Sequence, residues 1–207
     1  MSDDDGVQPP PKPRNPHLVA AAAFVAAFAL AFSCFSSRWL ANAGSDGEIM
    51  MGLRSTTECG SVGILLGPKP DECRTEDNSA YAEEWRGMTG QYYSASWAPF
   101  GTITTIAVLL GALGLFGAGV LGLSKTKPNL PLSPSTVALL GIMISLITGC
   151  VFVATKPGPG GFVGVGVTFW IFGIGAVIGI FVATVLAKLN RPVDPDLMDD
   201  AMNPDQF

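Results

Sequence analysis

Four long runs of apolar and neutral residues dominate the chain, and none of them contains Asp, Glu, Lys, Arg or His. A helix rises about 1.5 Å per residue, so about 20 such residues cross the roughly 30 Å hydrocarbon core of a bilayer. When the neutral residues that flank each run are counted, all four runs are long enough. The pattern predicts transmembrane helices at residues 17–35, 97–123, 135–155 and 162–187.

The segments between these runs differ greatly in length. Residues 36–96 form one large polar loop, whereas residues 156–161 allow only a tight turn of Lys, Pro and Gly, which predicts an antiparallel hairpin of the last two helices. The remaining segments are a tail at 1–16, a connection at 124–134 and an acidic tail at 188–207, and we expect both tails to be disordered. The sequence therefore predicts an all-α transmembrane fold, a four-helix bundle with one large outer loop.

The composition supports a membrane protein and excludes several other classes. Charged residues make up 14% of the chain, against about 25% in soluble domains, and apolar residues make up 48%. The net charge of -5 provides no basic surface for nucleic acid. One His and four Cys leave few metal ligands, so we expect no metal site and no cofactor. No motif identifies a small-molecule substrate.

The basic residues determine the expected orientation. Six basic residues lie on each side, but on one side five of them stand in the 36–96 loop, where nine acidic residues dilute them and the length weakens their effect, and only Lys156 stands in a short loop. The positive-inside rule then places both termini in the cytoplasm and the large loop outside, in a plasma membrane or a bacterial inner membrane. The basic residues on the predicted cytoplasmic side are Lys12, Arg14, Lys125, Lys127, Lys188 and Arg191.

The first run leaves a second interpretation open. It is rich in Ala, follows Lys12 and Arg14 and contains Ala29-Leu30-Ala31, so it also resembles a cleaved signal peptide. Its apolar stretch is longer than the roughly 7 to 15 residues of a signal peptide's apolar region, and acidic residues precede it. We therefore favour a retained span in contact with the lipid bilayer.

The four charge-free runs contain hydroxyl groups but no Asp, Glu, Lys, Arg or His. Pumps, channels and transporters usually retain ionisable groups along their pathways, although such groups are costly in lipid. The hydroxyls can bond to carbonyls of their own helix, so we interpret them as structural. The spans therefore give no indication of transport.

Small residues recur at every fourth position in the last three predicted spans. This spacing places them on one helix face, where close backbone approach and van der Waals packing hold helices together in lipid. We expect packing within one chain, and the alternative that some faces bind a second copy or another membrane protein stays open. The residues are Gly114, Ala118 and Gly122; Gly141, Ser145 and Gly149; and Gly175, Gly179 and Ala183.

The large loop contains two cysteines, Cys59 and Cys73, with 13 residues between them. Outside the cytoplasm such a pair is well placed for a disulfide, which contributes about 3 kcal/mol in the chain-entropy account. The alternative is a redox-active pair, but that chemistry more usually has the Cys-x-x-Cys spacing, which is absent. After the second cysteine, residues 79–93 have helical character and lead into the second span.

The order Trp39, Gly52-Leu53, Cys59, Cys73 and Arg86 ahead of the second span resembles the first extracellular segment of the claudin and peripheral myelin protein superfamily. The topology is similar over the whole chain, and the motif extends over residues 39–86. Two departures are visible. Arg54 stands where the family's Gly-Leu-Trp motif has its Trp, and the first Cys comes later than usual.

The resemblance implies a left-handed four-helix bundle and a small antiparallel sheet in the outer loop, stapled by Cys59 and Cys73. It implies that Trp39 and Gly52-Leu53 pack near the bilayer surface, and that the protein is not an enzyme. The second outer loop is much shorter than in barrier-forming claudins, and the C-terminal Asp205-Gln206-Phe207 lacks the usual scaffold-binding tail. We therefore expect a divergent claudin-like protein rather than a tight-junction component.

Several functions remain as hypotheses. The leading one is a structural or interaction protein that acts by lateral association or adhesion, through its outer loop and its small-residue helix faces. The alternative is an accessory subunit of a channel or transporter. A four-span thiol oxidase fits the topology but not the cysteine spacing. Tetraspanins also have four spans, but their large loop follows the third span rather than the first.

Overall fold

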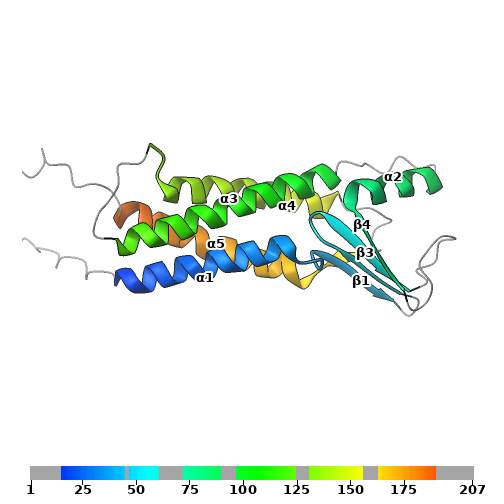
Figure 1. The fold of residues 1–207 in the computed structure, drawn as a ribbon, viewed down its shortest axis with the longest axis horizontal. Coiled ribbons are helices and arrows are strands. Elements are labelled where there is room, and N and C mark those ends of the chain that lie inside the picture. The colour runs from blue at the N-terminus through cyan, green and yellow to red at the C-terminus, as the bar shows by residue number, and fades with distance from the viewer. Residues whose placement is uncertain are drawn as a thin grey trace, which may run out of the picture.

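The computed structural model describes residues 15–44, 47–60, 72–89, 97–124, 131–155 and 163–189. Four helices within these ranges are long and apolar enough to cross a membrane. They are α1 (Pro16–Phe35), α3 (Trp97–Leu123), α4 (Pro134–Ala154) and α5 (Val167–Leu189). The predicted four-helix transmembrane bundle is therefore confirmed (Figure 1).

Helices α1 and α4 begin at sequence signals that favour a helix start. Pro16 and Pro134 occupy the first turn, where the N–H that proline lacks would have no partner within the helix. The residue before each proline caps the helix. The side chains of Asn15 and Ser133 each accept a hydrogen bond from an N–H of the first turn.

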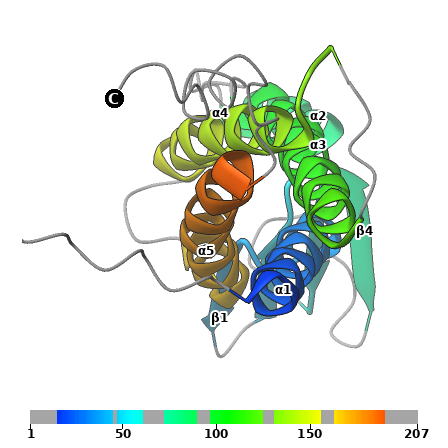
Figure 2. The same cartoon turned by 90° about the vertical axis from the view of Figure 1, so that its left-hand side faces the viewer.

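The four spans form a closed ring. Each span contacts the next along the chain, and α5 returns to contact α1 (Figure 2). The backbones of α3 and α4 approach very closely, because a Cβ atom on Gly141 would lie only 2.5 Å from the backbone nitrogen of Gly111. Such contact between backbones provides the van der Waals packing that holds helices together in lipid.

Most hydroxyl groups of the spans bond within their own helix, as predicted. Thr105, Ser145 and Thr184 each donate to a carbonyl one turn earlier. Thr104 also crosses between helices, since its hydroxyl lies 2.8 Å from that of Thr148 on α4. Among the described residues, no buried side-chain nitrogen or oxygen lacks a hydrogen-bond partner.

The loop after α1 folds into a small antiparallel sheet, as the resemblance implied. Its strand order is β4-β3-β2-β1-β5. A short helix follows β4 and lies largely within the segment 79–93 for which we expected helical structure. These elements are β1 (Leu40–Gly44), β2 (Gly47–Met51), β3 (Ser55–Cys59), β4 (Cys73–Asp77) and α2 (Asn78–Thr89).

The fifth strand corrects the predicted start of the last span. We expected a helix from residue 162, but Gly164–Val165 form β5, and α5 begins only at Val167. The turn expected at 156–161 lies outside the described residues. Strand β5 pairs antiparallel with β1. The physical reason is that Gly and Val alternate here, which suits an extended strand, and β1 offers an open sheet edge beside it. The residues that closely precede α5 are therefore part of the sheet.

Candidate functional site

Charged side chains gather at one end of the described molecule. Every described Asp and Glu lies from Glu48 to Glu84, in the sheet, in α2 or directly before β4. The described parts of the four spans contain only His17 and Lys188 as ionisable groups other than cysteine. We call the described parts of residues 36–89, together with β5, the outer domain. Most charged side chains of the described chain therefore lie in the outer domain.

The outer domain contains the predicted disulfide between Cys59 and Cys73, which is confirmed. The two cysteines lie directly opposite each other in the antiparallel pair of β3 and β4. Cys59 is the last residue of β3 and Cys73 the first of β4. The bond therefore holds these strands together at the point where the chain leaves the sheet.

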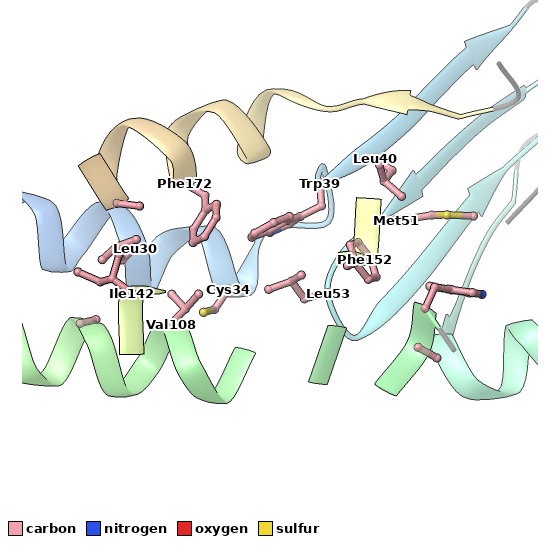
Figure 3. Close-up of a cluster of buried hydrophobic side chains, with 14 of the residues drawn as sticks. Leu30, Cys34, Trp39, Leu40, Met51, Leu53, Val108, Ile142, Phe152 and Phe172 are labelled. Carbon is pink, nitrogen blue, oxygen red and sulfur yellow. The ribbon is translucent and has the colours of Figure 1, made fainter. Parts of the chain in front are cut away.

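Trp39 joins the outer domain to the bundle (Figure 3). Its side chain is fully buried, and its indole N–H donates to the carbonyl of Ser33 at 2.6 Å, which satisfies a carbonyl near the end of α1. Its ring packs against Phe152 of α4 and Phe172 of α5, with centroids 6.3 and 4.9 Å away. Its backbone N–H donates to Met51 of β2. Trp39 thus contacts the end of α1, the helices α4 and α5, and strand β2 of the sheet.

A second attachment lies where β5 passes into α5. The Gly166 N–H donates to the carbonyl of Trp39 at 2.8 Å, and the hydroxyls of Ser36 and Thr168 lie 2.6 Å apart. A Cβ atom on Gly166 would lie 2.1 Å from the carbonyl oxygen of Arg38. Any side chain at this position would therefore push β1 away from α5.

The Gly52-Leu53 motif forms the third attachment. Leu53 is buried, and a Cβ atom on Gly101 of α3 would lie 2.0 Å from its carbonyl oxygen. Asn78, at the start of α2, holds the turn. Its amide nitrogen donates to the Gly52 carbonyl at 3.1 Å, and its amide oxygen accepts from the Thr56 hydroxyl at 2.9 Å. The motif therefore docks the sheet on α3.

Asn78 and Gly101 contribute to this attachment, and the sequence analysis did not identify either of them. Asn78 is almost completely buried, and both of its polar groups are satisfied. An Asn at the boundary between a strand and a helix is a recognisable signal, because Asx side chains favour helix starts. Gly101 carried no comparable signal within its apolar run.

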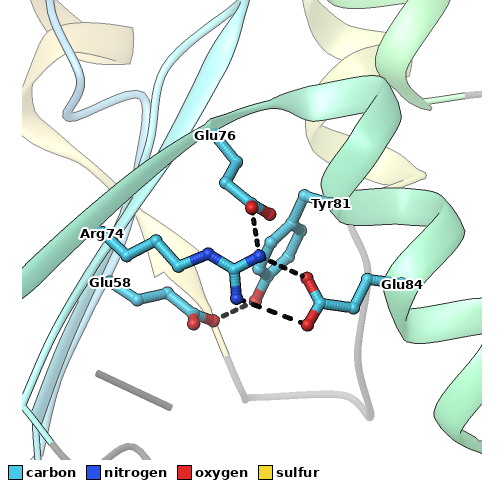
Figure 4. A network of polar contacts seen from close by, with 5 residues as sticks. All are labelled: Glu58, Arg74, Glu76, Tyr81 and Glu84. Atoms are coloured by element: carbon cyan, nitrogen blue, oxygen red, sulfur yellow. Dashed lines mark hydrogen bonds and ion pairs between the residues drawn. The ribbon is translucent and has the colours of Figure 1, made fainter. Parts of the chain in front are cut away.

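A polar network connects β3, β4 and α2 on the exposed side of the outer domain (Figure 4). The guanidinium of Arg74 pairs with Glu76 and, at 3.2 Å, with Glu84 of α2. The hydroxyl of Tyr81 donates to Glu58 at 2.5 Å. The hydrogen bond with Glu76, assisted by the charge of Glu84, raises the pKa of Arg74. The network fixes α2 against the sheet.

The small-residue faces lie inside the bundle. A Cβ atom on Gly114 would lie 2.5 Å from the backbone nitrogen of Ala138, and one on Gly179 would lie 2.8 Å from Ile142. The sequence left open whether these residues pack within one chain or bind a second copy or another membrane protein. These contacts support packing within the chain. Gly114, Ala118, Gly141, Ser145, Gly149, Gly175, Gly179 and Ala183 are buried, and Gly122 is half-buried against Leu186.

Only part of the predicted motif meets at the junction of sheet and bundle. Trp39 and Gly52-Leu53 lie at its centre, while Cys59 and Cys73 lie at the far end of the strands. Arg86 belongs to α2, but its side chain lies outside the described part of the chain, so its role stays a prediction.

The described residues include no group of three or more His, Cys, Asp or Glu that would hold a metal ion. No family model matches the chain, and no curated protein matches it. What the arrangement provides is a small polar domain attached to a membrane bundle at three positions.

Proposed function

We propose that this chain is a claudin-like interaction protein of the membrane, which acts by contact through its outer domain. The observation that carries the proposal is the triple attachment of that domain at Trp39, Gly166 and Leu53. A surface that is already fixed loses little conformational entropy when it binds, which favours affinity. The order of the motif residues supports the same proposal.

The β4–α2 face, formed by Arg74, Thr75, Glu76 and Glu84, is the contact surface that we propose. Strand β4 is one of the two edge strands of the described sheet, and Arg74 and Thr75 are exposed. A surface with both charge signs selects a partner by complementary charges, and that kind of recognition contributes specificity more than raw affinity. The expected partner is therefore the polar surface of another membrane protein or of a second copy.

Lateral association through the small-residue faces is not part of the proposal. Those faces are occupied by helices of the same chain. A partner that binds within the membrane would have to use the lipid-facing side chains instead. An accessory subunit of a channel or transporter would be expected to bind in that way, so the two functions predict different contact surfaces.

Photo-cross-linking separates these two surfaces. A photoreactive residue replaces either Thr75 on β4 or Thr184 on α5, both of which are exposed threonines. In native membranes we expect protein adducts from position 75 and mainly lipid adducts from position 184. Protein adducts from position 184 alone would reject contact through the outer domain and favour the accessory-subunit function. Absence of protein adducts at both positions would reject both functions.

A further inference from the structure

Two apolar grooves of nearly equal volume flank α1. The groove between α1 and α5 has a volume of about 450 Å³, and the groove between α1 and α3 has about 440 Å³. Both are lined almost entirely by apolar side chains, as expected for surfaces that face lipid. They differ in what lies at their ends.

The α1–α5 groove reaches the end of the bundle where α1 begins and α5 finishes. Asn15, the cap of α1, lines it, and so does Val185 on α5. Lys188 follows Val185 by three residues, which places it on the same helix face one turn further on, and it is exposed. The α1–α3 groove is lined between Phe24 and Ala31 on α1 and carries no charged residue.

The sequence has further basic residues close to Asn15 and Lys188, outside the described part of the chain. Arg14 is bonded directly to Asn15, and Arg191 follows Lys188 by three residues. The N–H groups of His17, Leu18 and Val19 all donate to Asn15, so the start of α1 adds only the positive end of the helix dipole. The described carboxylates all lie in the outer domain, at the opposite end of the bundle (Figure 1). The acidic residues of the two tails lie farther along the chain, at residues 3–5 and from Asp194 onward.

We propose that the α1–α5 groove binds an anionic glycerophospholipid, with one acyl chain in the groove and the phosphate beside Lys188 and the start of α1. The groove extends from Asn15 to Ala22 on α1, which is about 10 Å along a helix axis. This length fits the upper part of an acyl chain but is too short for a partner span. Basic pockets between spans at the membrane surface are suited to anionic headgroups.

The first test compares headgroups on the full-length protein in mild detergent. Native mass spectrometry measures the retention of phosphatidylglycerol and of phosphatidylcholine with identical acyl chains. We expect preferential retention of phosphatidylglycerol, about fivefold weaker binding in Lys188→Gln, and unchanged binding in Lys188→Arg. Glycerol 3-phosphate should not compete, because it has no acyl chain. Equal retention of both lipids, competition by glycerol 3-phosphate, or unchanged binding in Lys188→Gln would overturn the proposal.

A second pair of variants tests the groove itself. Ala22 lines the α1–α5 groove and Ala31 lines the α1–α3 groove, and both are half-buried on the same helix. Ala22→Leu should lower the retention of phosphatidylglycerol, whereas the matched Ala31→Leu should leave it unchanged. An equal loss in both variants would place the lipid elsewhere and reject the site. If Ala22→Leu does not fold, the Lys188 variants still decide the question.

Discussion

The bundle and the outer domain are stabilised in different ways, because they face different solvents. Lipid provides no hydrophobic drive between helices, so the spans rely on close backbone contact between small residues such as Gly111 and Gly141. In water, a small sheet buries little apolar area. The outer domain therefore also relies on a disulfide and on a network of charged hydrogen bonds. Trp39 lies where the two regions meet and contributes to both.

The comparison predicts that the largest effect comes from added bulk inside the bundle. Gly141→Leu would force apart the backbones of α3 and α4, where even a Cβ atom would lie 2.5 Å from Gly111. Because neither backbone can yield locally, we expect destabilisation of more than about 4 kcal/mol, seen as loss of monodisperse protein.

Gly173 on α5 provides the matched control, since a Cβ atom there meets no atom within 4 Å. Gly173→Leu should leave yield and melting temperature almost unchanged. Equal tolerance of both substitutions would show that backbone contact does not hold the bundle.

Removal of Trp39 should weaken both regions together. Trp39→Ala deletes a fully buried indole, and such changes cost about 3 to 5 kcal/mol. Trp39→Phe should cost less, because it keeps an aromatic ring and loses the hydrogen bond to Ser33. Trp170→Ala is the control, because that side chain is 63% exposed. Limited proteolysis of the outer domain and thermal unfolding of the bundle measure the two regions separately, and a change in only one of them would contradict the role of Trp39 as the link.

The disulfide should act on the outer domain alone. Cys59→Ser opens a loop with a sequence separation of 14, for which the chain-entropy account gives about 3 kcal/mol. We expect faster proteolysis of the sheet while the melting temperature of the bundle stays the same. Cys150→Ser is the control, since Cys150 is free and exposed. A bundle that melts earlier in Cys59→Ser would show that the regions are more strongly coupled than we propose.

The polar network should give the smallest effect. Tyr81→Phe removes the hydrogen bond to Glu58 and should cost about 1 kcal/mol, measured by proteolysis of the outer domain. Arg74→Gln should change stability too little to measure, because the ion pairs are exposed.

The raised pKa of Arg74 also gives a pH expectation. The contribution of Arg74 to the free energy of unfolding is fully present below the ordinary pKa of arginine and is lost only at higher pH. Arg74 should therefore cause no pH dependence of stability between about pH 6 and 8. A difference in pH dependence between the parent protein and Arg74→Gln in this range would contradict that expectation.

The sequence predicts the bundle well, because a charge-free run long enough to cross the thickness of a membrane is a local signal. The disulfide was also predictable, since it needs only two cysteines at a suitable spacing on the same side. Strand β5 was missed because it lies inside a charge-free run that also fits a helix. The alternation of Gly and Val in residues 163–167 was the signal for it.

The three attachments could be predicted only in part. The contacts of Trp39 with Phe152 and Phe172 join segments more than a hundred residues apart, and no periodic pattern records such pairs. The docking of Leu53 on Gly101 depends on how the sheet lies on α3. The resemblance to claudins identified Trp39 and Gly52-Leu53 as residues of interest, but it could not identify Asn78 or Gly166.

The pairing of β1 with β5 has a consequence for the order of events on the ribosome. Val165 is made long after its partner Leu40, and at about 5 to 20 residues per second the interval is roughly 6 to 25 s. During that interval the nascent chain presents β1 as an open edge, and open edges pair readily with other chains. The sheet is therefore complete only after synthesis of β5, which closely precedes the last span. A chain that stalls before that point therefore lacks the strand that pairs with Leu40 and Ala41 of β1.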